Sequence, residues 1–338
     1  MFLVTGGTGF FGKTLVRALA QRGEPVRVLA RANSDVSGLD VKNVTLVRGS
    51  IEDRASMEQA LRGVDVLFHS AAVVKELVKD RSIFDAINVA AFDSVLDLAG
   101  QAGVKRVVYT SSFFALGPSD RAPARIADES WQREPRYCTD YERTKYLAEA
   151  VVQKHVASGL DVVSVLPGFI FGPGDMTEGN LITRTLLDLE QGRLPGLPGG
   201  GRKLWCLVST EDVKQGHLLA LEKGKKGARY LIGGDNVAII DLLREYHRLG
   251  GSRPPRLSLP FFVVDVGGAL EELRWKLTGA NVMLSKGKAC AARHDWAYSS
   301  ERARKELGYT WTPWQEVLAR TVAWMKDKGL LKARGGAR

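Results

Sequence analysis

Two side chains in the run Tyr141-Glu-Arg-Thr-Lys145 have the types and the spacing for proton transfer. Residues four apart lie on one face of a helix, so the lysine ammonium can approach the tyrosine phenol. A phenol with a pKa of about 10 is a poor acid at neutral pH, but a nearby cation stabilises the phenolate and lowers that pKa. The Ser112 hydroxyl could hold a substrate oxygen and stabilise its developing charge. Ser112, Tyr141 and Lys145 are therefore the expected catalytic residues, and hydride transfer beside a nicotinamide is the expected chemistry.

Two alternatives for these roles stay open. Ser111 competes with Ser112, because the two serines are adjacent in the triplet Thr110-Ser-Ser112. Tyr137 is a weaker rival to Tyr141, because no lysine stands four residues after it.

A glycine-rich turn opens the chain, in the run Thr5-Gly-Gly-Thr-Gly-Phe-Phe-Gly12. It stands between a strand pattern and a helix pattern, which is the context that a dinucleotide-binding loop requires. Glycines allow a tight turn and close approach of the backbone to a pyrophosphate, and a helix N-terminus faces the negative charge. The expected cofactor-binding residues of this loop are Thr5, Gly6, Gly7, Gly9, Phe10, Phe11 and Gly12.

The end of the second expected strand bears on the choice between NADP and NAD. NAD-selective sites usually place Asp or Glu there to bind the ribose hydroxyls, whereas this chain has Arg31. An arginine can pair with a 2′-phosphate and stack on adenine. NADP is therefore the expected cofactor, although Asp35 could still serve as a ligand for NAD. Ser50 and Ile51 are also expected to contact the cofactor.

Short apolar runs alternate with amphipathic stretches over the first half of the chain. This alternation predicts βαβ crossovers and an α/β fold, a doubly wound parallel sheet of the Rossmann type with helices on both faces. The expected strands are Phe2–Thr5, Val26–Ala30, Val44–Arg48, Val64–His69, Arg106–Thr110 and Val162–Leu166. The expected helices are Gly12–Arg22, Ser56–Leu61, Ala90–Ala102 and Asp140–Ser158. Ser112 follows the fifth strand, at the carboxyl edge where ligands bind in such sheets.

The alternation of strand and helix patterns ends at Pro167, after which glycines and prolines interrupt the chain. We expect a dinucleotide-binding domain at residues 1–166, to which residues 204–222 return. Residues 167–330 are expected to form mainly a smaller substrate-binding lobe, interleaved with the first domain. Residues 331–338 are a basic tail.

The composition, with 45% hydrophobic and 25% charged residues in 338, is that of a soluble globular protein. The net charge of +10 comes from scattered lysines and arginines without zinc-finger spacing, so nucleic acid is not an expected partner. A solvated basic surface, an anionic substrate group and a peripheral membrane surface remain open. The cysteines, Cys138, Cys206 and Cys290, are far apart and odd in number, which argues against a disulfide framework and a metal site. With no visible signal peptide or spanning run, a reduced, cytoplasmic location is expected.

The chain resembles the extended short-chain dehydrogenases/reductases of the epimerase/dehydratase superfamily over nearly its whole length. The matching motifs are the glycine loop, Phe68-His-Ser-Ala-Ala72, Asn88, Tyr109-Thr-Ser-Ser112, Tyr141–Lys145, Leu166–Gly174, Glu211-Asp-Val213 and Lys305–Tyr309. The resemblance implies that Ala71 and Ala72 line the cofactor and that Pro167 and Ile170 border the nicotinamide. It also implies that Asn88 supports the neighbouring helix and that the protein is a homodimer. Independently of the resemblance, Lys145 has the donors to hold the nicotinamide ribose beside Tyr141. We interpret His69 as structural and Cys138 as a loop residue.

The resemblance is stronger to the branch of dihydroflavonol reductases and 3β-hydroxysteroid dehydrogenases than to the nucleotide-sugar enzymes. The latter usually carry a diphosphate-binding arginine where this chain has Trp205. The apolar segment Leu259–Val266 suits a hydrophobic substrate, although a core helix would explain it nearly as well. We therefore expect an oxidoreductase that interconverts a ketone and a secondary alcohol on a hydrophobic small molecule. A nucleotide-sugar epimerase or dehydratase is the alternative, and a non-catalytic sensor or assembly factor is a third possibility.

Overall fold

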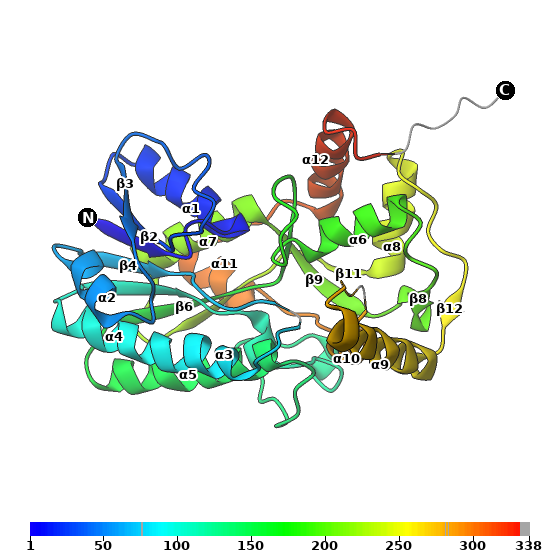
Figure 1. The fold of residues 1–338 in the computed structure, drawn as a ribbon, viewed down its shortest axis with the longest axis horizontal. Helices are drawn as coiled ribbons and strands as arrows, with labels where there is room; N and C mark the ends of the chain where they lie inside the picture. Colours follow the sequence, from blue (N-terminus) through cyan, green and yellow to red (C-terminus); the bar gives the residue numbers. More distant parts are fainter. Residues whose placement is uncertain (76, 281, 283, 332–338) are drawn as a thin grey trace.

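A seven-stranded parallel sheet forms the centre of the larger part of the molecule in the computed structural model (Figure 1). The structure describes residues 1–338 except 76, 281, 283 and 332–338, so most of the expected basic tail lies outside the described residues. The strand order is β10-β6-β5-β4-β1-β2-β3. The strands are β1 (Phe2–Thr5), β2 (Val26–Ala30), β3 (Val44–Arg48), β4 (Val66–His69), β5 (Arg106–Thr110), β6 (Val162–Pro167) and β10 (Arg229–Ile232).

Helices cover both faces of this sheet, because its central strands are apolar on both sides and must be buried on both. One layer consists of α1 (Phe10–Gln21), α7 (Thr210–Lys223) and α11 (Glu301–Leu307). The other consists of α2 (Arg54–Leu61), α4 (Phe92–Gln101) and α5 (Asp140–Ala157). The short α3 (Ser82–Asp85) and a π-helical segment, η1 (Ala86–Ala91), lead into α4. The fold is thus the expected doubly wound α/β sheet.

A smaller lobe lies at the carboxyl edge of the sheet, around its own core. Its sheets have the orders β11-β9-β7 and β12-β8. The strands are β7 (Phe169–Phe171), β8 (Leu197–Pro198), β9 (Leu204–Ser209), β11 (Asn236–Ala238) and β12 (Ser258–Leu259). The helices are α6 (Leu181–Glu190), α8 (Ile239–Arg248), α9 (Phe261–Thr278), α10 (Lys286–Ala291) and α12 (Trp314–Asp327). Short 3-10 turns occur at η2 (Phe113–Leu116), η3 (Pro123–Arg125) and η4 (Gly199–Gly201).

The segment expected to return to the first domain divides between the two parts. Its helix, α7, packs against β6 and β10 of the large sheet, whereas its strand, β9, belongs to the three-stranded sheet. The seventh strand of the large sheet, β10, has no counterpart among the expected strands. None of the helices in the described part of the chain has both the length and the apolarity to span a bilayer.

A disulfide joins Cys138 to Cys290, which corrects the expectation that the cysteines are unpaired. The two residues are 152 positions apart, but their Cα atoms are 5.4 Å apart in the fold. The close contact of α10 with the loop before α5 explains this, since a Cβ on Gly287 would meet the Thr139 side chain at 2.7 Å. Cys138 lies in that loop, as expected, and the odd cysteine, Cys206, is buried and free. The cysteines therefore no longer support the expected reduced compartment.

Candidate active site

The glycine turn between β1 and α1 brings the backbone close to neighbouring segments. Gly6 has a φ of +73°, and a Cβ there would meet the Ser70 backbone at 2.5 Å. A Cβ on Gly12 would collide with the Gly6 backbone. Helix α1 starts after Gly9, which has no side chain to cap it, and the first turn reads Phe-Phe-Gly-Lys. The Lys13 amide donates a 3.0 Å bond to the Gly9 carbonyl. The three amides before it are thus available to an anion, in the field of the helix N-terminus.

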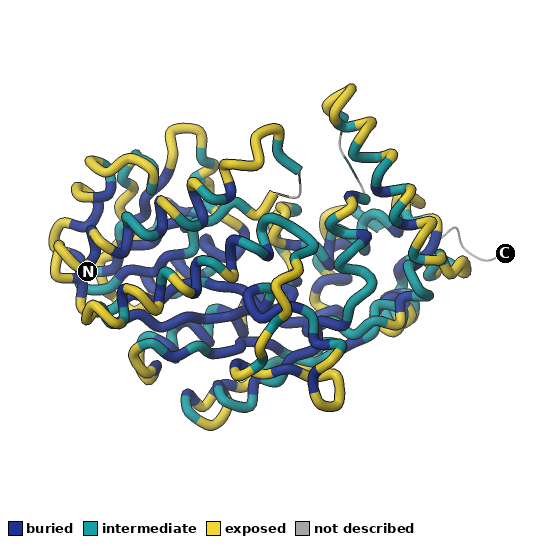
Figure 2. The backbone as a smooth tube through the Cα atoms, turned by 90° about the horizontal axis from the view of Figure 1, so that it is seen from below, coloured by how far each residue is buried: buried dark blue, intermediate teal, exposed yellow. Residues whose placement is uncertain are grey.

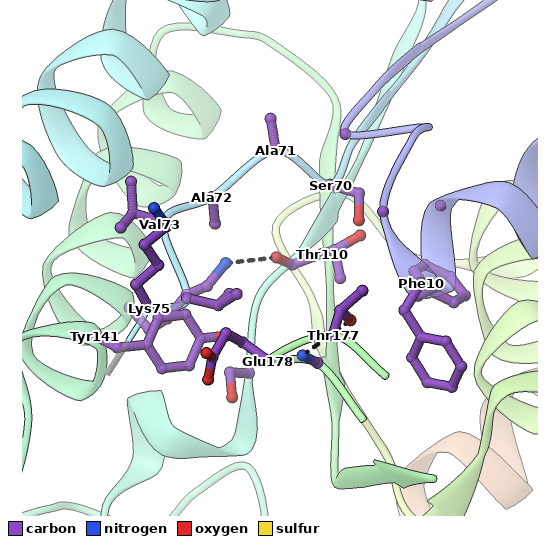
Figure 3. A pocket seen from close by; sticks show the side chains of 18 of the residues that line it. Phe10, Ser70, Ala71, Ala72, Val73, Lys75, Thr110, Tyr141, Thr177 and Glu178 are labelled. Atoms are coloured by element: carbon purple, nitrogen blue, oxygen red, sulfur yellow. Dashed lines mark hydrogen bonds between the residues drawn. The ribbon is translucent and has the colours of Figure 1, made fainter. Parts of the chain in front are cut away.

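A cavity of about 490 Å³ runs from this turn to Tyr141. Most of the residues that the sequence singled out line it. They are Gly6, Gly9, Phe10, Phe11, Gly12, Arg31, Ser50, Ile51, Ala71, Ala72, Ser112, Tyr141, Lys145, Pro167 and Ile170. Figure 3 shows Phe10 and Tyr141 on opposite sides of the cavity, with Ala71 and Ala72 on the segment between them.

Thr5 and Gly7 are not among the described residues of the cavity wall. Thr5 is buried, and its hydroxyl lies 3.0 Å from the Nδ1 atom of His69. A Cβ on Gly7 would meet the Val28 side chain at 2.8 Å, so this glycine allows α1 to pack closely on the sheet. Both residues therefore support the conformation of the glycine loop without lining the cavity. His69 ends β4, as expected, and burial lowers its pKa to about 3.

The expected catalytic side chains come from two adjacent elements. Ser112 follows β5, and its Oγ accepts a hydrogen bond of 3.3 Å from the Phe114 amide. Tyr141 lies in the first turn of α5, whose N-cap Thr139 accepts a 3.0 Å bond from the Glu142 amide. Burial raises the pKa of Tyr141 to about 12, and the Ser112 hydroxyl beside the phenol opposes that rise. Ser112 is therefore the serine that faces the phenol.

Lys145 is buried and turned toward β5. Its Nζ donates a 2.8 Å bond to the Thr110 carbonyl, drawn in Figure 3, and lies 5.8 Å from the centre of the Tyr141 ring. Burial lowers the Lys145 pKa to about 7. The expected lowering of the Tyr141 pKa by this lysine is therefore not seen, because desolvation dominates at both groups.

Ser111, the alternative to Ser112, also lines the cavity. It is buried, and beside Glu149 it lowers the pKa of that carboxyl, which burial otherwise raises. Tyr137 is not among the described lining residues, and its ring lies under the Arg133 guanidinium, 4.2 Å from ring centre to Cζ.

Arg31 and Ser34 line the cavity at the end away from Tyr141, next to the glycine turn. Asp35, the possible NAD ligand, is not among the described lining residues and accepts a 2.7 Å bond from Lys13 Nζ. That ion pair is the main cause of the low pKa of Asp35. Lys13 also donates a 3.2 Å bond to Asp175. The Asp35 carboxylate is therefore already paired with a lysine that was not among the expected site residues.

Aromatic side chains form the wall beside Tyr141. Phe114 packs edge-on against Tyr141 with ring centres 5.9 Å apart, and Phe113 stacks on Phe114. Phe169 lines the cavity, and Trp205 stacks behind it with ring centres 4.4 Å apart. This wall was not among the features expected from the sequence, although the pair Phe113-Phe114 directly after Ser112 is a signal for it.

The segment Leu259–Val266 does not form the apolar surface that was expected over the substrate. The described residues that line the cavity include none from α9, and they include one from α10, Lys288. The other lining residues absent from the expectations include Val73, Val74, Lys75, Thr177, Glu178 and Leu181. The loop of Thr177 and Glu178 lies over the cavity in Figure 3, and its position depends on the folded lobe rather than on a sequence motif.

The family model for the NAD dependent epimerase/dehydratase family matches residues 2–233. The chain belongs to this family. Sterol demethylase protein B of Methylococcus capsulatus is 37% identical over 97% of the chain and 99% of that protein. A putative dihydroflavonol 4-reductase of Synechocystis sp. is 31% identical over 98% and 96%. The crystal structure of gox2253 has a TM-score of 0.82 at 30% identity over 98% and 99%.

This member of the epimerase/dehydratase family is an NAD(P)-dependent enzyme of the short-chain dehydrogenase/reductase type. Asn88 has the supporting place implied by the resemblance. It accepts a 2.7 Å bond from the Val73 amide and donates 3.0 Å bonds to the Val73 carbonyl and to Thr144 on α5. In this family member, one amide side chain thus joins the cavity wall to the helix that carries Tyr141.

Proposed function

We propose that this enzyme is an NADP-preferring oxidoreductase that interconverts a ketone and a secondary alcohol on a hydrophobic small molecule. The observation that carries the proposal is the aromatic wall of Phe113, Phe114 and Phe169 next to Ser112 and Tyr141. Trp205 reinforces that wall at the position expected to bear an arginine in nucleotide-sugar enzymes. The names of two relatives refer to a sterol and to dihydroflavonol, both ring systems, which supports an apolar substrate.

The residues present fit a dinucleotide. The bare amides of the α1 N-terminus and the glycines without room for a Cβ suit the pyrophosphate. Arg31 and Ser34 line the end where a 2′-phosphate would lie, and the engagement of Asp35 by Lys13 favours NADP over NAD. Ala71, Ala72, Pro167 and Ile170 supply the uncharged surface at the other end. The bound cofactor supplies or accepts the hydride.

The chain's own residues handle the proton and the substrate oxygen. The Ser112 hydroxyl binds the oxygen and orients the carbonyl. The Tyr141 phenol donates a proton to that oxygen during reduction, and the Tyr141 phenolate accepts a proton from it during oxidation. Lys145 would hold the ribose of the bound cofactor, and its ammonium form would lower the free-energy cost of forming the Tyr141 phenolate. The aromatic wall excludes water from this group.

A substrate panel tests the proposal. Thermal-shift and turnover measurements with NADPH should respond to apolar ketones, such as a 3-ketosteroid, and the affinity should grow with ring count or chain length, by about 0.8 kcal/mol for each buried methylene. Phe114→Ala should raise the KM for these ketones, while Phe2→Leu, a substitution in the core remote from the cavity, serves as the control. UDP-glucose and UDP-galactose should have no effect. Saturable binding of a UDP-sugar, or epimerisation without net change of the cofactor, would show the alternative function instead.

A further inference from the structure

Helix α9 (Phe261–Thr278) presents its apolar face to solvent. Only two of its 18 residues, Val264 and Gly268, are buried. Figure 2 shows this helix projecting from the body of the molecule at the upper right, mostly as exposed and intermediate residues. Most helices in proteins are stabilised by burying an apolar face, so the apolar face of α9 lacks a matching surface within the described chain.

The exposed apolar side chains lie on one stripe, which we call the α9 face. Their spacing of three and four residues places them on the same side of the helix. Its members are Phe262, Val266, Leu270, Leu273 and Leu277, with Leu257 just before the helix, and their exposed fractions run from 53% to 77%. No other large apolar side chain among the described residues exceeds 42%. Concentrated exposure of this kind marks an interaction surface rather than scattered surface residues.

The charges around the α9 face indicate what it contacts. Residues 251–290 hold six cationic residues, Arg253, Arg256, Arg274, Lys276, Lys286 and Lys288, and three anionic ones, Asp265, Glu271 and Glu272. Two of the anionic residues are held by the chain's own arginines, in the pairs Asp265–Arg293 and Glu271–Arg274. Arg256 and Lys276 are exposed beside the stripe. A twofold contact between two copies would bring these cationic rims together, whereas an anionic lipid surface complements them.

Helix α9 also neighbours an element that contributes to the cavity wall. Helix α9 packs on α10, and Lys288 of α10 lines the cavity. Val74, another lining residue, is itself 41% exposed.

We propose that the α9 face is a docking surface for anionic lipid bilayers, in which α9 lies in the interface with its apolar side chains among the acyl chains and its cations at the headgroups. The binding itself needs no catalysis. Its benefit to the enzyme rests on the proposed function, because only an apolar substrate is concentrated in the membrane.

Vesicle co-sedimentation with the full chain tests the docking without any substrate. Wild type should bind phosphatidylcholine vesicles that contain phosphatidylglycerol at least tenfold better than vesicles of phosphatidylcholine alone, and less as salt screens the charges. The double variant F262E/L270E should lose at least tenfold, and R256E/K276E should lose the preference for anionic lipid. Leu46→Glu is the matched control, since Leu46 is 36% exposed on β3, far from α9; it should bind within twofold of wild type.

Melting temperature and light scattering complete the experiment. Because the substituted side chains are exposed, F262E/L270E should melt within a few degrees of wild type. Failure of wild type to bind anionic vesicles, or an equal loss in Leu46→Glu, would overturn the proposal. So would a wild-type dimer that F262E/L270E converts to a monomer, because the α9 face would then be a subunit interface. None of these outcomes depends on which substrate the enzyme reduces.

Discussion

Lys145 Nζ donates a 2.8 Å hydrogen bond to the Thr110 carbonyl oxygen, and this bond joins the two elements that carry the proposed catalytic residues. Thr110 is the last residue of β5, two residues before Ser112, and Lys145 is one helical turn after Tyr141. The Thr110 hydroxyl lies 2.9 Å from His217 Nε2 on α7, so the strand end is held from both faces of the sheet. The serine and the tyrosine are thereby kept in register before any ligand binds.

Replacement of Tyr141 by Phe should lower kcat by about 10²–10⁴-fold, because the proton donor is lost. The affinity for NADPH should change less than twofold, since the phenol does not hold the dinucleotide. Steady-state kinetics and a fluorescence titration of NADPH measure the two effects. Tyr137→Phe is the control, because that ring lies under Arg133 away from the cavity; a comparable loss in this variant, or full activity of Tyr141→Phe, would contradict the assignment.

The buried Lys145 should make the stability of the ligand-free protein depend on pH. Its pKa falls from 10.5 to about 7 on folding, so between these values the unfolded chain binds more protons and stability rises with pH. Wild type should therefore gain stability relative to Lys145→Met as pH increases from 7 to 10, by an amount on the order of a few kcal/mol, since each pKa unit corresponds to about 1.4 kcal/mol. Urea unfolding at pH 7, 8, 9 and 10 measures the difference. Parallel curves for the two proteins would show that Lys145 is not desolvated.

Removal of the Arg31 guanidinium should weaken NADPH binding by roughly tenfold or more, because a hydrogen bond to a charged group contributes about 1.5–3 kcal/mol. The affinity for NADH, which lacks the 2′-phosphate, should change much less. Titration of both cofactors into wild type and Arg31→Ala measures this. Arg54→Ala removes an equal charge from the exposed Arg54–Glu58 pair and serves as the control. Equal or tighter binding of NADH by wild type would mean that Arg31 does not select the cofactor.

The disulfide between Cys138 and Cys290 should be detectable by thiol titration. The denatured, unreduced protein should show one thiol, that of Cys206, and the reduced protein three. Cys138→Ser should lose about 2–4 kcal/mol of stability, because the bond closes a long loop in the unfolded chain. Dithiothreitol should lower the melting temperature of wild type and leave that of Cys138→Ser unchanged. Three thiols in the unreduced protein would rule the bond out.

The sequence alone determined those features that depend on residues close together in the chain. Strands β1, β2, β3 and β5 have the predicted bounds, because buried strands require short apolar runs ended by turn residues. The glycine turn and the Tyr141–Lys145 pair were recognisable for the same reason, since a helix or a tight turn encodes its geometry over a few positions.

Only the tertiary structure decided which distant groups meet. Nothing near Cys138 indicates that α10 lies beside it, and nothing near Asp35 indicates that Lys13 engages it. Lys145 was expected to lower the pKa of Tyr141, but in the fold its ammonium group donates to the Thr110 carbonyl of β5. Burial, which no local sequence pattern specifies, lowers the pKa of Lys145 itself. The apolar pattern of α9 likewise fits a buried helix and an exposed one equally well. Which of the two it is depends on the packing of the whole lobe, because burial is a property of the surroundings and not of the segment.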